Sequence, residues 1–291
     1  MSKILLFNAT GMQGTSIAQY LKAKGHEIIA PVRSDQKQAQ MEANGYDAFV
    51  TDYSLNSLVP QLKSVDKVVL QIPAQIAPSA MIDIAQKCIT AILEAGYPDT
   101  VFVISSTLPD QKVGVPSVDA RVTMKDLSLE NLPKTPILSA TEYLENFSTA
   151  YRAAILDNGI IPQTIPADYP VNYLSWTDLA QYVGAALFTD SLEGKLYRIG
   201  GNKGMTGNDL AKRLGIVLGK ELHYAPITHA ELAGFLTPIL GEGVAKDYAE
   251  FYEYQDTQGQ HLLNPDTSEI RKLLGIALPT FEQWASVAFG V

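Results

Sequence analysis

Short apolar runs alternate with longer amphipathic stretches through the first half of the chain. Runs that are hydrophobic at nearly every position are typical of parallel strands buried on both faces of a sheet. The strands predicted in this way are residues 3–7, 27–32, 48–51, 67–72 and 101–105. Between them, apolar residues recur at helical spacing, which predicts helices at residues 14–24, 35–44, 55–63 and 78–95. Cys88 lies on the apolar stripe of the last helix and is predicted to be a small core residue.

The pattern is less regular in the second half. Residues 108–134 contain several prolines and mixed charges, with a helical hint only at 120–129. A strand at 136–139, a helix at 143–156, a hairpin or pocket wall at 159–173, a helix at 178–188 and a strand at 195–199 are predicted next. From about residue 204 the chain is predicted to be mostly helical. Capping-box patterns that begin at Thr206, Thr228 and Thr280 mark three of these helix starts.

Alternating strands and helices predict an α/β fold with a doubly wound parallel sheet of the Rossmann type and a smaller, mostly helical C-terminal domain. The dinucleotide-binding domain is predicted to span residues 1–155, with 174–200 returning to it. Residues 156–173 and 201–291 are predicted to form the smaller, substrate-binding domain.

The composition of the chain limits the kinds of binding partner and the cellular compartment that we expect. The net charge of −9 argues against a nucleic-acid partner, because phosphate binding needs a basic surface. A single cysteine excludes an intrachain disulfide and favours a reducing compartment, so we expect a cytoplasmic protein. No apolar run has the length of a membrane span, and the N-terminal run is too short for a signal peptide, so no membrane partner is expected. The four histidines lack ligand spacing, and no metal site is expected.

The most informative segment is the glycine-rich turn between the first strand and the first helix. Glycines let backbone amides approach a pyrophosphate, and the helix N-terminus attracts its charge. Asn8 stands where such loops have their first glycine, and asparagine tolerates the left-handed backbone angles that the turn requires. We predict dinucleotide binding here, with a purely structural turn as the alternative. The predicted cofactor contacts in this segment are Asn8, Thr10, Gly11, Met12, Gln13 and Gly14.

The end of the second strand favours NADP(H) over NAD(H). An acidic residue there would select NAD, but Arg33 and Ser34 occupy the position, and Asp35 comes two residues too late. Arg33 offers paired donors to a 2′-phosphate, Ser34 a hydroxyl and Lys37 a further charge. The alternative for Arg33 is a solvated cation at a helix start.

Further polar residues follow the third, fourth and fifth strands, at the edge where ligands bind in open α/β sheets. Asp52 has an alternative role as the cap of the next helix. The predicted cofactor contacts at this edge are Asp52, Tyr53, Gln71, Ile72, Pro73, Ser105 and Ser106.

The chain resembles the NmrA-like family of atypical short-chain dehydrogenases/reductases. The resemblance rests on residues 8–14, 32–33, 52–53 and 136–147, with support from 176–180, 194–197 and 205–211. It implies a Rossmann domain with a smaller C-terminal domain, NADP(H) as cofactor, and a pocket between the two. It also implies that Ala140 and Tyr143 contact the cofactor. Residues implied to line the substrate side are Tyr143, Asn146, Phe147 and Tyr169.

The Tyr-x-x-x-Lys pair of ordinary short-chain reductases is missing after the fifth strand. Arg121 and Lys125 lie near the position where many relatives keep a lone lysine, and the sequence does not decide between them. Lys125 and Tyr143 are the catalytic candidates. Tyr143, Phe147 and other aromatic residues suit a flat acceptor, with interdomain packing as the alternative.

These features predict an NADPH-dependent oxidoreductase that transfers hydride to a quinone-like or other planar small molecule. The alternative is a non-catalytic NADP(H)-sensing regulator that acts through a protein partner, and an isoflavone-reductase-like enzyme or isomerase is a third reading. The sequence leaves a homodimer open.

Overall fold

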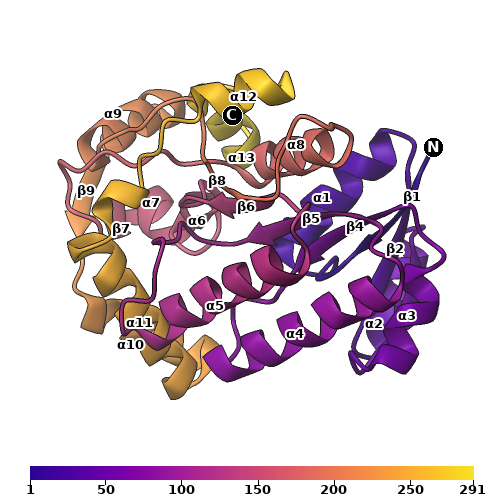
Figure 1. The fold of residues 1–291 in the computed structure, drawn as a ribbon. Helices are drawn as coiled ribbons and strands as arrows, with labels where there is room; N and C mark the ends of the chain where they lie inside the picture. Colours follow the sequence, from indigo (N-terminus) through magenta and orange to yellow (C-terminus); the bar gives the residue numbers. More distant parts are fainter.

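The computed structural model describes residues 1–291 and is organised around a seven-stranded sheet (Figure 1). The strands, in sheet order, are β3 (Asp47–Val50), β2 (Glu27–Val32), β1 (Lys3–Leu6), β4 (Lys67–Gln71), β5 (Asp99–Ile104), β6 (Ile137–Ala140) and β8 (Leu196–Ile199). Every neighbouring pair is parallel. This arrangement confirms the predicted Rossmann fold, and the strand order reverses between β1 and β4.

Helices cover both faces of this sheet. The helices are α1 (Met12–Ala23), α2 (Asp35–Ala43), α3 (Leu55–Leu62), α4 (Pro78–Glu94), α5 (Pro116–Asn131) and α8 (Trp176–Leu187). One apolar cluster joins the sheet to α1, α2 and α8, and a second joins its other face to α3, α4 and α5 (Figure 1). The first five strands and the first four helices lie within two residues of their predicted bounds. Cys88 is fully buried in the second cluster, as predicted.

Helix α5 is longer than the hint at residues 120–129. It begins with Pro116, which suits the first turn because its missing N–H has no partner in a helix. The helix buries Ser117, Arg121, Lys125 and Ser128 among its apolar residues. Since polar side chains are buried here, the apolar periodicity that predicts a helix from sequence is weak.

The single helix predicted at 143–156 is wrong. Tyr143 instead pairs with Leu174 in an isolated β-bridge. Helices α6 (Glu145–Ser148) and α7 (Arg152–Asn158) follow, separated at Thr149, whose φ of −120° and ψ of −86° are not helical. The Thr149 N–H and hydroxyl both donate to the Glu145 carbonyl, which satisfies the end of α6.

A hairpin at 159–173 is also not observed. Strand β7 (Ile160–Gln163) pairs in parallel with β9 (His223–Pro226), a strand that the sequence pattern does not predict. The partner lies about sixty residues further along the chain, and parallel strands require such a crossover.

The C-terminal third is mostly helical, as predicted. It contains α9 (Gly207–Leu218), α10 (His229–Leu240), α11 (Glu242–Thr257), the 3₁₀ helix η1 (Gln260–Leu262), α12 (Ser268–Leu274) and α13 (Phe281–Phe289). The three predicted capping boxes are confirmed, and Ser175 forms a fourth at the start of α8. A third apolar cluster joins α6 and α7 to β7, α9 and α13. None of the helices combines the length and apolarity needed to cross a membrane.

Candidate cofactor and acceptor cleft

The glycine-rich turn has the geometry of an anion cradle. Asn8 has a left-handed φ of 57°, which confirms that asparagine serves in place of glycine here. The Gly11 N–H donates to the Asn8 carbonyl at 2.9 Å and closes the turn. A Cβ on Gly14 would lie 2.1 Å from the same carbonyl oxygen, so only glycine fits. No side chain caps α1 at Gly11, and its first amides therefore keep their hydrogen-bonding capacity for a ligand.

A cleft of about 230 Å³ opens beside this turn, at the carboxyl edge of β1, β4, β5 and β6. Open α/β sheets bind ligands at this edge, next to the point where the strand order reverses. The walls of the cleft come from the turn, from the ends of these strands, and from α5, α8 and α11. Its lining residues are Asn8, Gly11, Met12, Gln13, Pro73, Ala74, Gln75, Ser105, Arg121, Thr141, Glu142, Tyr143, Asn146, Trp176, Tyr248, Phe251 and Tyr252.

Three polar side chains tie the turn to the ends of two strands. The Ser105 hydroxyl donates to Gln13 Oε1 at 2.7 Å, and Gln71 Nε2 donates to the same oxygen. Gln71 Oε1 is buried without a partner. A buried amide oxygen that lacks a donor is costly, so a ligand group with an N–H would find an acceptor here.

Tyr143 has a hydroxyl that is buried without a hydrogen-bond partner, although the side chain lines the cleft. Burial and the nearby Glu145 carboxylate hold the pKa of Tyr143 above its ordinary value, against a smaller opposing effect of Ser105. The hydroxyl is therefore protonated at neutral pH and is a hydrogen-bond donor for a bound molecule. No lysine lowers its pKa in the manner of ordinary short-chain reductases.

The cation at this cleft is Arg121 and not the predicted Lys125. Lys125 Nζ donates to the Asp110 carbonyl at 2.6 Å and pairs with Asp126 at 3.1 Å, outside the cleft. The two cations are four residues apart on α5, so they lie on the same face of the helix, about 6 Å apart along its axis. Arg121 is one turn nearer the start of the helix, which lies at the carboxyl edge.

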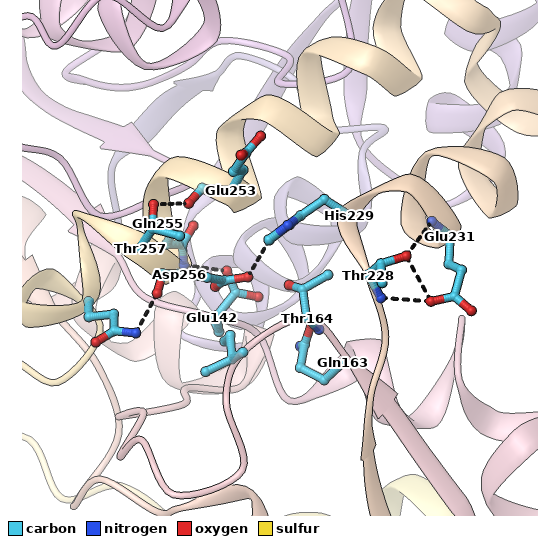
Figure 2. Close-up of polar contacts among 12 residues, drawn as sticks. Glu142, Gln163, Thr164, Thr228, His229, Glu231, Glu253, Gln255, Asp256 and Thr257 are labelled. Carbon is cyan, nitrogen blue, oxygen red and sulfur yellow. Dashed lines mark hydrogen bonds and ion pairs between the residues drawn. The ribbon is translucent and has the colours of Figure 1, made fainter.

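Glu142 is a buried carboxyl of the cleft that the sequence analysis did not single out. Gln255 Nε2 donates to its Oε1 at 2.9 Å (Figure 2). Tyr252 Oη and Asn146 Nδ2 approach Oε2 only to 3.4 Å. Burial raises the pKa of Glu142 to about 7, the Gln255 hydrogen bond opposes this, and nearby Asp256 reinforces it. Helix α11 therefore contacts the residues that follow β6 (Thr141–Tyr143, the strand-end segment) through a carboxyl that is partly protonated at neutral pH.

The end of α11 is tied to the start of α10 by a contact between buried Asp256 and half-buried His229. His229 Nε2 lies 3.0 Å from Asp256 Oδ2, as Figure 2 shows. Burial raises the pKa of Asp256, and the His229 contact opposes that effect. Because Gln255 and Asp256 are adjacent, the same turn of α11 binds both the cleft wall and α10. These contacts hold the aromatic face of α11 over the cleft.

The predicted 2′-phosphate residues have unequal roles. Arg33 is exposed at the end of β2 and has no hydrogen bond to protein. Ser34 caps α2 and accepts from the Lys37 N–H, and the ammonium of Lys37 contacts Gln40. Arg33 is therefore the side chain whose donors remain available to a ligand.

The N-cap residue of α3 is Ser54, and Asp52 supports the turn that leads into this helix. Its carboxylate accepts from the Ser54 N–H and the Ser57 hydroxyl at the start of α3, and these bonds hold its pKa at about 2. Tyr53 has a left-handed φ of 63°. Burial raises the pKa of Tyr53, and the charge of Arg33 opposes this effect.

The cleft does not include every predicted contact. Asn8, Gly11, Met12, Gln13, Pro73, Ser105, Tyr143 and Asn146 line it. Phe147 is buried against Tyr151 and Tyr173, so it has the packing role that was the alternative to acceptor binding. Tyr169 lies at the edge of the same apolar cluster. The other predicted contacts that do not line the cleft are Thr10, Gly14, Gln71, Ile72, Ser106 and Ala140.

Several cleft residues were missed by the sequence analysis. Tyr248, Phe251 and Tyr252 form a stripe at helical spacing on α11, and this stripe was the available signal. Nothing in the sequence indicates which surface the stripe covers, because the strand-end segment lies about a hundred residues away.

The fold and the cleft together define a Rossmann-type α/β protein with a glycine-turn cradle and a ligand cleft at the carboxyl edge. The NmrA-like family model matches residues 1–285, and the chain belongs to this family. Quinone oxidoreductase 2 of Escherichia coli K12 is 23% identical over 99% of this chain and 99% of its own. The structure of the E. coli NADPH-dependent quinone oxidoreductase in complex with NADPH has a TM-score of 0.80 at 23% identity, over 98% of this chain and 99% of its own.

Two further relatives have different roles. The triphenylmethane reductase of Citrobacter sp., in complex with NADP(H), has a TM-score of 0.79 at 21% identity, over 98% of this chain and 99% of its own. The photosystem II assembly factor Ycf39 of Synechocystis sp. is 25% identical over 79% of this chain and 72% of its own. The proteins that this chain resembles are therefore named as reductases and, in one case, as an assembly factor.

Proposed function

We propose that this protein binds NADP(H) and transfers hydride from NADPH to a quinone-like or other planar acceptor. The observation that carries the proposal is the cradle at Asn8–Gly14, which opens directly into an aromatic-walled cleft at the carboxyl edge of the sheet. The NADPH-bound quinone oxidoreductase and the NADP(H)-bound dye reductase, which share this fold, support it.

The residues present fit the cofactor. The uncapped amides at the start of α1 suit the pyrophosphate, and Arg33 suits a 2′-phosphate. The unpartnered Gln71 Oε1 and the Tyr143 hydroxyl offer an acceptor and a donor to a carboxamide. When bound, NADPH supplies the hydride, and the protein supplies orientation and a dry site.

The acceptor is proposed to lie between the strand-end segment and α11. Tyr248, Phe251 and Tyr252 provide flat apolar faces that stack on a ring system. We also propose the predicted division of the chain, with residues 1–155 and 174–200 holding the cofactor and 156–173 and 201–291 completing the acceptor side. The pairing of β7 with β9 inside the second part supports it. The single buried thiol at Cys88 supports a cytoplasmic location.

A non-catalytic NADP(H)-sensing role is the second candidate. The cleft volume of about 230 Å³ is below the usual range for ligand pockets, and one relative is named as an assembly factor. In this reading, α11 would report cofactor binding to a protein partner.

One experiment separates the two. Purified protein is titrated with NADPH by fluorescence, and loss of NADPH absorbance is then followed with a panel of benzoquinones and naphthoquinones. We expect tight NADPH binding and turnover with at least one quinone. Tight binding without turnover by any acceptor would favour the sensor, and no binding would contradict both.

A further inference from the structure

Arg121 is a buried cation whose charge nothing in the protein balances. The side chain is 4% exposed and lines the cleft from α5. It forms none of the ion pairs of the molecule. Burying a guanidinium without a counter-ion is costly, so such groups are normally paired.

The contacts of Arg121 leave most of its donors unused. Nη1 donates to the Ser117 carbonyl of the same helix at 2.7 Å, and the guanidinium lies 5.0 Å from the centre of the Phe251 ring. Arginine carries five N–H donors in a planar fork. The Ser117 bond is the one hydrogen bond of the side chain, which lines the cleft, so its other donors are available there to a ligand.

Glu142 of the cleft and two other carboxylates, those of Asp110 and Asp126, have partners of their own. Glu142 shares the cleft but accepts from Gln255 and makes no ion pair with Arg121. Asp110 pairs with Arg198, and Asp126 pairs with Lys125. Arg121 is therefore the one cation that lines the cleft, and the one carboxyl there, Glu142, is partly protonated and makes no ion pair with it.

We propose that Arg121 is an anion-binding subsite that selects acceptors with a negatively charged oxygen on a planar ring. This inference rests on the proposed function and names its substrate class. The fork suits a carboxylate or sulfonate, and Phe251 stacks on the same guanidinium that would bind it. The same charge disfavours cationic dyes, since like charges repel in a buried site.

Binding of a matched pair of non-reducible ligands tests the subsite without turnover. The affinities of 2-naphthoate and 2-naphthamide for the wild-type protein are measured by calorimetry in the presence of NADP⁺. We expect naphthoate to bind about 10- to 100-fold more tightly, as a charge-assisted hydrogen bond implies. Equal affinities would overturn the proposal, and this comparison needs no variant.

Variants then assign the preference to one side chain. Arg121→Gln is expected to reduce naphthoate binding to the naphthamide level and to leave naphthamide unchanged. Lys125→Gln, one turn away on the same helix but outside the cleft, is the matched control and should keep the preference. A loss of NADPH affinity in Arg121→Gln as large as the loss for naphthoate would place the anion on the cofactor and overturn the proposal.

Kinetics separate this inference from the proposed function. A sulfonated naphthoquinone should have a higher kcat/KM than its neutral parent in the wild-type protein and not in Arg121→Gln. Cationic triphenylmethane dyes should react better with the variant. Quinone turnover without any charge preference would refute the subsite alone, whereas naphthoate selectivity without turnover would refute the reductase and leave the subsite.

Discussion

At the scale of single residues, the nucleotide end of the site depends on a few side chains with unsatisfied capacity. Asn8 accepts the left-handed angle of the turn, Gly14 leaves room for the Asn8 carbonyl, and Arg33 keeps its donors free. The sequence alone predicts these residues as cofactor contacts, because each role depends on local backbone geometry or on position at a strand end. The sequence did not decide whether Ser34 and Asp52 face a ligand. Ser34 caps α2, and Asp52 accepts hydrogen bonds in the turn before α3.

Arg33→Gln should weaken NADPH binding by about 10- to 100-fold and leave NADH binding unchanged. The lost interaction is a charge-assisted contact with the 2′-phosphate, which NADH lacks. Fluorescence titration with each cofactor measures the effect, and Lys37→Gln is the matched control for a cation on the following helix. Equal losses for the two cofactors would show that Arg33 does not read the phosphate.

At the scale of elements, α11 is joined to the strand-end segment by a carboxyl and not by apolar contacts alone. Gln255 and Tyr252 meet Glu142 from one side of this helix, and Asp256 meets His229 at its end. The sequence predicts such a helix but not its partner, because amphipathic spacing defines a face and not the surface that it covers. The choice between Arg121 and Lys125 was undecidable for the same reason.

Glu142→Gln should make folding stability less sensitive to pH. Burial raises the pKa of Glu142 from 4.5 to about 7, so the folded chain retains a proton that the unfolded chain releases. This contribution is complete below pH 4.5 and is lost as the pH rises through about 7. Urea unfolding should give similar stabilities for variant and wild type at pH 4.5 and a more stable variant at pH 8, by about 3 kcal/mol at most.

Glu253→Gln, an exposed position on the same helix, provides the control and should follow the wild-type curve. If the folding stability of Glu142→Gln fell with rising pH in parallel with that of the wild type, the carboxyl would be ionised throughout. Its burial would then have no effect on its protonation.

At the scale of the whole molecule, the cleft is built from segments that are far apart in the chain. The turn at Asn8, the strand ends up to Thr141–Tyr143, and α11 all contribute walls. A ligand that contacts all of them couples the main sheet to the C-terminal helices. Cofactor binding should therefore stabilise the molecule as one unit.

Saturating NADPH should raise the free energy of unfolding by about 2.7 kcal/mol at a concentration of 100 Kd, because it binds only the folded chain. In thermal unfolding this corresponds to an increase in Tm of roughly 4 °C within a single transition. Nicotinamide mononucleotide, which lacks the adenosine half, is the control and should shift Tm less. A second transition that NADPH leaves in place would show that the C-terminal helices unfold independently.

The sequence by itself determined the doubly wound sheet, the glycine turn and the helix caps, because these depend on short-range periodicity, on backbone conformation and on neighbouring residues. It also predicted Arg33 as a cofactor contact, because this residue follows the end of a predicted strand. Only the tertiary structure decided the pairing of β7 with β9, the break in residues 143–156 and the walls of the cleft. Arg121, Glu142 and α11 are brought to the cleft by contacts between distant segments, and one turn of α5 decides which of its two cations lines the cleft.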